Sequence, residues 1–134
     1  MSARAHTTAV LSLMRATGVT VYDGRVPDAP SYPYAVLYPD VGMLTPPMLT
    51  NVSCELTMTL YVHAVGTTRD QAQWVAEKIR DALIDVRPAV TGRHLWPIRQ
   101  DITRPPERDD TLPAVVVFDQ VATYRLRSVP ASAA

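Results

Sequence analysis

Apolar and polar residues alternate most regularly in residues 51–64, NVSCELTMTLYVHA. Every second side chain in this segment is apolar, and most of those between are polar. A period of two residues indicates a β-strand with one buried and one solvated face. We therefore predict a long strand here, with a buried face formed by Val52, Cys54, Leu56, Met58, Leu60, Val62 and Ala64.

A helical pattern begins directly after this strand. Thr68 is a favourable N-cap, and Gln71 three residues further on completes a capping box. Pro88 ends the pattern. The apolar residues at helical spacing are Ala72, Val75, Ile79, Ala82 and Val86. A shorter helix is predicted over residues 8–17, which a glycine follows.

The remaining strands are shorter or less regular. Residues 19–22, 34–38 and 114–127 are rich in β-branched and aromatic side chains, which is typical of strands. Residues 93–102 also fit a strand, but Pro97 cannot donate a ladder hydrogen bond. We therefore expect an edge strand or a bulged strand there.

The order of these elements predicts the fold class. Residues 24–33 and 103–113 are proline-punctuated and are predicted loops, which leaves the order α-β-β-β-α-β-β. Short connections favour a mainly antiparallel sheet of about five strands with both helices on one face, an α+β fold. The length of 134 residues fits one domain over residues 1–128, followed by a flexible tail at residues 129–134.

An apolar segment occupies the place of a hairpin tip, between two predicted strands. Residues 43–50 read MLTPPMLT, whereas hairpin tips usually carry Gly, Asn, Asp or Ser. The strand that follows would be about 46 Å long, whereas a spherical domain of this size is about 36 Å across. We expect a long β-hairpin arm whose apolar tip docks on a partner. The alternative is a coiled or bulged strand whose tip folds back onto the core.

Composition and charge narrow the classes of partner. The formal net charge is zero, with 13 basic and 13 acidic residues, which argues against a binder of nucleic acid or anionic membranes. The longest wholly apolar run, residues 114–118, is too short to span a bilayer. The first residues lack the apolar core of a signal peptide, and the single Cys54 excludes an intramolecular disulfide. We expect a protein made and kept in the cytoplasm.

Candidate catalytic chemistry is sparse. The histidines are His6, His63 and His94, and Cys54 points to the opposite strand face from His63 because the two are an odd number of residues apart. The five glycines are not clustered, so a phosphate-binding loop is not expected. We predict no catalytic residue, no cofactor and no metal site. A catalytic His63 or His94 is the less favoured alternative to a surface histidine.

Charged residues gather in one predicted loop. A solvated loop is the default interpretation, because isolated surface ion pairs contribute little. The alternative is an electrostatic patch that faces a neighbouring molecule and sets its register. The candidate interface residues from the tip and from this loop are Met43, Leu44, Pro46, Pro47, Met48, Leu49, Arg104, Glu107, Arg108, Asp109 and Asp110.

Three segments together resemble a known family. YAVLYPD at residues 34–40, ELTMTLYVHAVG at residues 55–66 and TTRDQAQWVAEKIRDALID at residues 67–85 are similar to the tail terminator (tail completion) proteins of long-tailed bacteriophages. The matching pieces are Pro33-Tyr34, the end of the long strand, and Leu83-Ile84-Asp85. The resemblance extends from the first helix to Leu126.

This resemblance implies a structural role in the virion. Such proteins form a hexameric ring that caps the tail tube, stops its polymerisation and meets the neck proteins of the head. The implied partners are further copies of the chain, the major tail tube protein and a neck or stopper protein, with no membrane and no cofactor. Double-stranded DNA would pass through the lumen without specific binding. The implied location is the tail–neck junction of the virion, and the host cytoplasm during assembly.

Two other classes remain open from the sequence. One is a head–tail connector or stopper protein from the same region of the virion. The other is a small α+β ligand-binding module or enzyme, which would require a concave pocket with convergent polar groups.

Overall fold

The computed structural model describes residues 3–47, 52–109 and 116–131. Helix α1 spans Ala3–Arg15 and helix α2 spans Arg69–Leu83. The strands are β1 (Thr20–Asp23), β2 (Tyr34–Pro39), β3 (Met43–Thr45), β4 (Glu55–Gly66), β5 (Arg93–Leu95), β6 (Arg99–Thr103), β7 (Glu107–Asp109) and β8 (Val117–Pro130). All belong to one eight-stranded sheet. The predicted α+β class is confirmed, but the sheet has more strands than the five expected.

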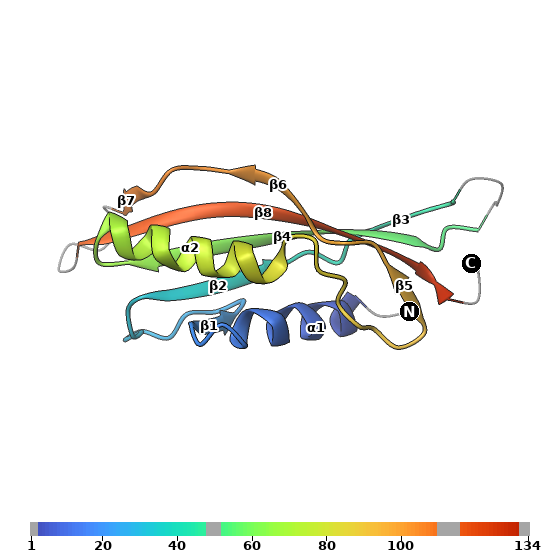
Figure 1. The fold of residues 1–134 in the computed structure, drawn as a ribbon, viewed down its shortest axis with the longest axis horizontal. Helices are drawn as coiled ribbons and strands as arrows, with labels where there is room; N and C mark the ends of the chain where they lie inside the picture. The colour runs from blue at the N-terminus through green and yellow to red at the C-terminus, as the bar shows by residue number, and fades with distance from the viewer. Residues whose placement is uncertain (1–2, 48–51, 110–115, 132–134) are drawn as a thin grey trace.

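The sheet is organised around two long antiparallel strands. β4 and β8 pair from Leu56↔Ser128 to Gly66↔Phe118 and run along the long axis of the molecule (Figure 1). β2 and β3 pair with the other edge of β4, while β5, β6 and β7 pair with successive parts of β8. β1 pairs with β2 in parallel, and the other described pairings are antiparallel. The mainly antiparallel sheet is therefore confirmed.

Both helices pack on the same face of the sheet, as predicted. The helix side chains Val10, Met14, Val75 and Ile79 belong to one core cluster with alternate residues of β4. The members of that cluster from β4 are Leu56, Met58, Leu60, Val62 and Ala64. The predicted inward face of the long strand is confirmed for these residues. It was wrong for Val52, which is 65% exposed and precedes the start of β4 at Glu55. Leu83 rather than Ala82 completes the helix stripe, because Leu83 is buried and Ala82 is only half-buried.

The predicted start of α2 is also confirmed. The Thr68 hydroxyl oxygen accepts a hydrogen bond from the Gln71 backbone N–H at 3.1 Å. The Gln71 side-chain oxygen reaches back to the Thr67 backbone N–H at 2.9 Å, one residue earlier than in the usual capping box.

Helix α1 begins at Ala3 rather than near residue 8, so the prediction was short by more than one turn. The additional turn contains His6, which is fully buried. A polar residue on the buried side carries no apolar signal, and the sequence pattern therefore missed it.

The predicted strand over residues 93–102 is divided at Pro97 into β5 and β6. Ile98 turns into the core and is 0% exposed, whereas Ile102 is 57% exposed, although regular alternation would place both on one face. A bulge between Gln100 and Ile102 explains the difference, because one extra residue reverses the alternation of side chains. The predicted loop that follows contains the three-residue strand β7.

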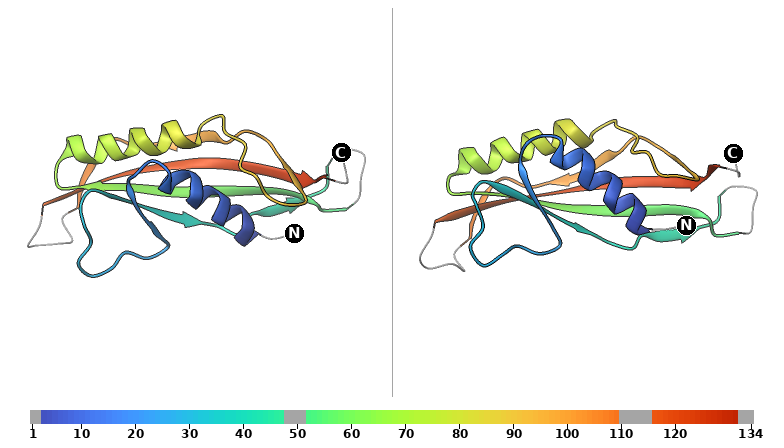
Figure 2. Two further views of the ribbon diagram at one scale, coloured as in Figure 1. Left: turned by 60° about the horizontal axis from the view of Figure 1, so that its bottom comes forward. Right: turned by 90° about the horizontal axis from the view of Figure 1, so that it is seen from below.

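The long strand is accommodated in an elongated body rather than a spherical one (Figure 2). β4 begins at Glu55, and β8 accompanies it from Leu56 onward. The described part of the predicted arm, β3 with the start of β4, is therefore the end of the sheet and not a free two-stranded hairpin. At the other terminus, β8 continues to Pro130, three residues beyond the predicted end at Arg127.

Candidate functional site

The two predicted groups of interface residues lie at opposite ends of the β4–β8 ladder (Figure 1). β3 pairs with Glu55–Thr57 at the start of β4. β7 pairs with Val117–Asp119 of β8, and Asp119 lies opposite Val65 near the end of β4. Glu55 and Val65 are about 33 Å apart along the strand. The structure therefore does not bring the two groups together, but presents them as separate surfaces.

One end carries an apolar tip, which we define as Val41, Met43, Leu44, Pro46, Pro47 and Val52. Met43 is 69% exposed and Leu44 is 47% exposed. Met48 and Leu49, which were predicted to belong here, lie outside the described residues. Residues 41–54 contain no acidic or basic side chain.

Gly42 fixes the backbone that presents this tip. Its φ is 78°, and a Cβ at this position would lie 2.6 Å from the Leu56 side chain and 2.8 Å from the Thr57 carbonyl oxygen. Only glycine therefore lets the chain approach β4 closely enough for β3 to pair. The apolar side chains of β3 are held in a defined place at the end of the sheet.

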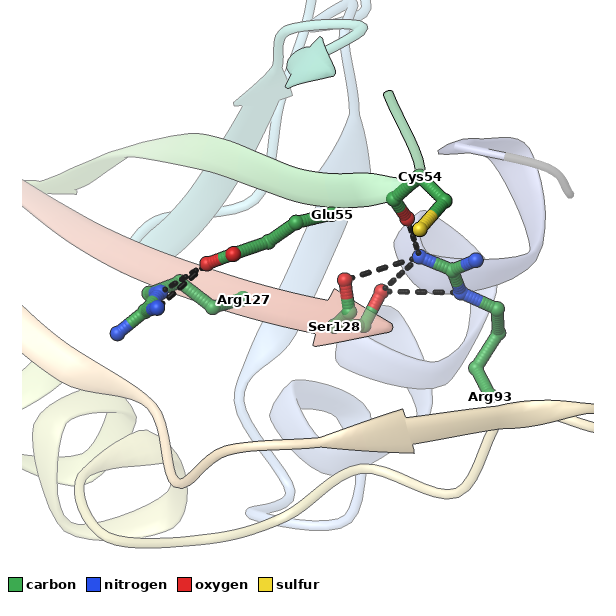
Figure 3. Close-up of polar contacts among 5 residues, drawn as sticks. All are labelled: Cys54, Glu55, Arg93, Arg127 and Ser128. Atoms are coloured by element: carbon green, nitrogen blue, oxygen red, sulfur yellow. Dashed lines mark hydrogen bonds and ion pairs between the residues drawn. The ribbon is translucent and has the colours of Figure 1, made fainter. Parts of the chain in front are cut away.

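A partly buried polar network lies next to the tip, where β5, the end of β8, the residue before β4 and helix α1 meet (Figure 3). Nη2 of Arg93 donates to the Cys54 carbonyl oxygen at 3.0 Å and to the Ser128 carbonyl oxygen at 2.9 Å. Nε and Nη2 of Arg93 also donate to the Ser128 hydroxyl oxygen at 3.2 and 3.0 Å. Burial lowers the pKa of Arg93 from its ordinary value, and the neighbouring Cys54 opposes this shift.

The network extends to helix α1 through His6, whose Nε2 is 2.8 Å from the Ser128 hydroxyl oxygen. Because a guanidinium has only donors, the Ser128 hydroxyl oxygen accepts from Arg93. The same hydroxyl therefore links the Arg93 guanidinium to the His6 imidazole. Sequence analysis missed this network, because its members are far apart in the chain and each is polar.

The face of the sheet opposite the helices is partly uncovered, and we call this uncovered part the open face. A small cluster formed by Tyr34, Val36, Val65 and Val117 occupies one end of that side, with Val26 and Tyr32 packed against it. Beyond it, Tyr61 is 43% exposed. The open face contains a hollow of about 400 Å³ lined by Tyr61, Ile102, Arg104, Glu107, Val121 and Thr123.

The predicted charge cluster is brought together at the edge of the open face. Arg104, Glu107, Arg108 and Asp109 line a second hollow of about 260 Å³ together with Asp119. Arg104 and Glu107 line the open-face hollow as well. Asp110 lies outside the described residues. Part of the cluster, Arg104 and Glu107, thus forms a charged rim on one side of the apolar open-face hollow, which the sequence pattern did not indicate.

The predicted surface position of His63 is confirmed, and the residue has a carboxylate partner. Nδ1 of His63 is 2.9 Å from Oδ2 of Asp119, with both side chains about 30% exposed. Tyr38 packs edge-on against the His63 ring at a centroid distance of 5.4 Å. Among the described residues, no group of three or more His, Cys, Asp or Glu side chains could hold a metal ion. Within the same residues, no helix is long and apolar enough to cross a membrane.

The fold is a small α+β domain whose surface carries groups of exposed apolar side chains, a feature typical of proteins that act by contact with other proteins. The family model described as Tail completion protein gp17 matches residues 2–125, and the chain belongs to this family of phage tail structural proteins. The family is not an enzyme family. The resemblance seen in the sequence is confirmed.

Two solved structures share the fold. A chain of the virion of a native gene transfer agent particle matches with a TM-score of 0.69 and 17% identity, over 91% of this chain and 92% of that chain. The gp17 protein of bacteriophage SPP1 matches with a TM-score of 0.52 and 18% identity, over 92% of this chain and 88% of that chain. A comparison with curated protein sequences gives no significant match.

Proposed function

We propose that the chain forms a ring that caps the finished tail tube, stops its polymerisation and joins the tail to the neck proteins of the head. Membership of the tail completion family over residues 2–125 carries this proposal. The ring is a hexamer, as the family resemblance implies. It sits at the tail–neck junction of the virion after assembly in the host cytoplasm, with the major tail tube protein on one side and a neck or stopper protein on the other.

The separation of unlike surfaces supports this role. A terminator must contact its own copies, the tube below and the neck above, so it needs several distinct surfaces. The apolar tip and the charged rim lie about 33 Å apart on one continuous strand ladder. Burial of apolar area supplies affinity, whereas charged groups set register and partner choice. The two ends are therefore suited to different contacts.

The charges of the open face around Arg125 and Arg127, beside the hollow, suit a channel that DNA crosses without being held. Nη2 of Arg125 lies 3.1 Å from Oδ2 of Asp101. Arg127 forms an ion pair with Glu55 and packs over the Trp96 ring at 4.8 Å. Arginines that are paired with carboxylates neutralise few phosphates, so we infer that they attract passing double-stranded DNA only weakly. We propose no specific contact between the chain and DNA.

Deletion of the gene from the phage tests the proposal. We expect overlong tail tubes without heads in electron micrographs, and restoration of normal, joined tails when the chain is supplied from a plasmid. Tails of normal length beside heads that lose their DNA would instead favour the head–tail connector or stopper function. Normal virions in the absence of the chain would overturn both functions.

A further inference from the structure

Exposed large apolar side chains gather in two places on the described surface. Val41, Met43, Leu44 and Val52 belong to the apolar tip. Tyr38, Tyr61 and Ile102 lie on the open face, where Ile102 is 57% exposed. Single exposed apolar residues are ordinary, but contiguous groups mark contact surfaces. Each group therefore requires an occupant.

The open-face hollow has the anatomy of a receiving site. Its apolar lining comes from Tyr61, Ile102 and Val121, and Arg104 and Glu107 provide opposite charges around it. An apolar centre within a polar rim is the usual arrangement of a protein interface. The volume of about 400 Å³ is in the range of a cleft that takes a few side chains.

The tip of one chain cannot reach the hollow of the same chain. Met43 pairs with Thr57 of β4, and Ile102 pairs with Thr123 of β8, which lies opposite Tyr61. This register separates Met43 and Ile102 by about 13 Å along the strands and about 14 Å across them, or about 19 Å in all. Both belong to one hydrogen-bonded sheet, which prevents them from meeting. The occupant of the hollow must come from another molecule.

We propose that the apolar tip of one copy docks in the open-face hollow of the next copy and that this contact builds the ring. The inference rests on the proposed ring function. A contact between two different surfaces of the same protein can repeat from copy to copy, and it forms a ring when the rotation between neighbouring copies closes. Each contact can be weak, since closure of the ring makes the later contacts intramolecular.

The chemistry of the tip favours a second copy as the occupant. The residues that define the apolar tip carry no acidic or basic side chain, so insertion into the hollow leaves no charge buried without a partner. Arg104 and Glu107 remain at the rim, where they can set the register of the incoming strand. Both halves of the contact are present on this chain, and neither half is filled within the described part of it.

Cysteine cross-linking on assembled tails tests the contact. The background is Cys54→Ser, which removes the only native thiol and keeps the backbone carbonyl that Arg93 uses. Met43→Cys and Ile102→Cys are then made as two single variants, which are mixed, and also together as one double variant. A disulfide needs Cα atoms within about 7 Å, so the separation of about 19 Å within one chain restricts this bond to pairs of copies.

We expect mixed single variants to give a disulfide-linked dimer and the double variant to give a ladder that ends at the closed ring. The matched control pairs Met43→Cys with Trp74→Cys, a site on helix α2 that is 47% exposed compared with 57% for Ile102, and should give no dimer. The proposal would be overturned if Met43→Cys linked equally well to Trp74→Cys or if it linked to itself. A ladder from the double variant that stopped at the dimer would also overturn it.

The state of the tails separates this inference from the proposed function. Tails of normal length that show no Met43–Ile102 linkage would refute tip docking and leave capping intact. Tails that stay overlong even with the wild-type chain would refute capping itself. As an independent measure, Ile102→Ser should weaken self-association in sedimentation by about ten- to a hundredfold, whereas Trp74→Ser should leave it unchanged. Equal weakening by both changes would also contradict docking in the hollow.

Discussion

Leu60 at the centre of β4 offers the sharpest test of the core assignment. Its side chain is 0% exposed and faces both helices, and it lies opposite Tyr124 of β8. Leu60→Ala removes buried methyl groups beneath a helix and between two paired strands, which cannot easily close on the space. Such substitutions cost about 2–5 kcal/mol in free energy of unfolding. This is a substantial fraction of the stability of a typical small domain, about 5–15 kcal/mol in total.

Urea denaturation followed by circular dichroism measures this loss. An unfolding entropy of about 2.1 cal/mol/K per residue converts the loss into a fall in Tm of about 7–18 °C for a chain of this length. The urea dependence, m, should stay constant while the midpoint falls. Thr59→Ala is the matched control, because its half-buried side chain lies on the opposite face, and it should cost less than about 1 kcal/mol. A loss below about 0.5 kcal/mol for Leu60→Ala would show that the wrong face was assigned to the core.

Three further predictions address the remaining polar groups. Ser128→Ala leaves the donors of Arg93 without their shared hydroxyl acceptor and should cost about 1–3 kcal/mol in urea denaturation, and a neutral change would contradict the network. Burial raises the pKa of Tyr124 to about 12. The contribution of protonated Tyr124 to the free energy of unfolding is therefore complete below pH ~10 and is lost as pH rises toward 12. Tyr124→Phe should lessen the fall in Tm at alkaline pH. The same dependence of Tm on pH in the variant and the wild type would contradict this role of Tyr124. His63→Ala and His94→Ala should leave tail assembly intact apart from small stability losses, and loss of assembly by a folded variant that still binds tails would contradict a purely structural role.

The elements that the sequence predicted well are those whose signal is local. β4 alternates because only one of its faces meets the helices, and its polar face remains half-exposed. Helix α2 has its own capping residues, so Thr68 marks its start without any tertiary information.

The elements that the sequence missed depend on distant partners. β7 has three residues and exists as a strand because β8 pairs with it. The bulge near Asp101 turns the side chain of Ile102 to the open face. There Ile102 and Tyr61 line the same hollow from the two sides of β8. His6 becomes a core residue only because the end of β8 supplies the Ser128 hydroxyl. The single usable signal for the hollow was an aromatic residue, Tyr61, on the polar face of an alternating strand.

Tail length in phage that carry a polar tip tests the central claim most directly. Met43, Leu44, Met48 and Leu49 are replaced together by Ser, and tails are measured in electron micrographs while the Tm of the purified domain is recorded. Because Met43 and Leu44 are exposed, the Tm should be nearly unchanged, and the phage should produce overlong or headless tails. A domain that melts at much lower temperature while assembled tails keep normal length would show that the tip belongs to the core and does not act in tail completion.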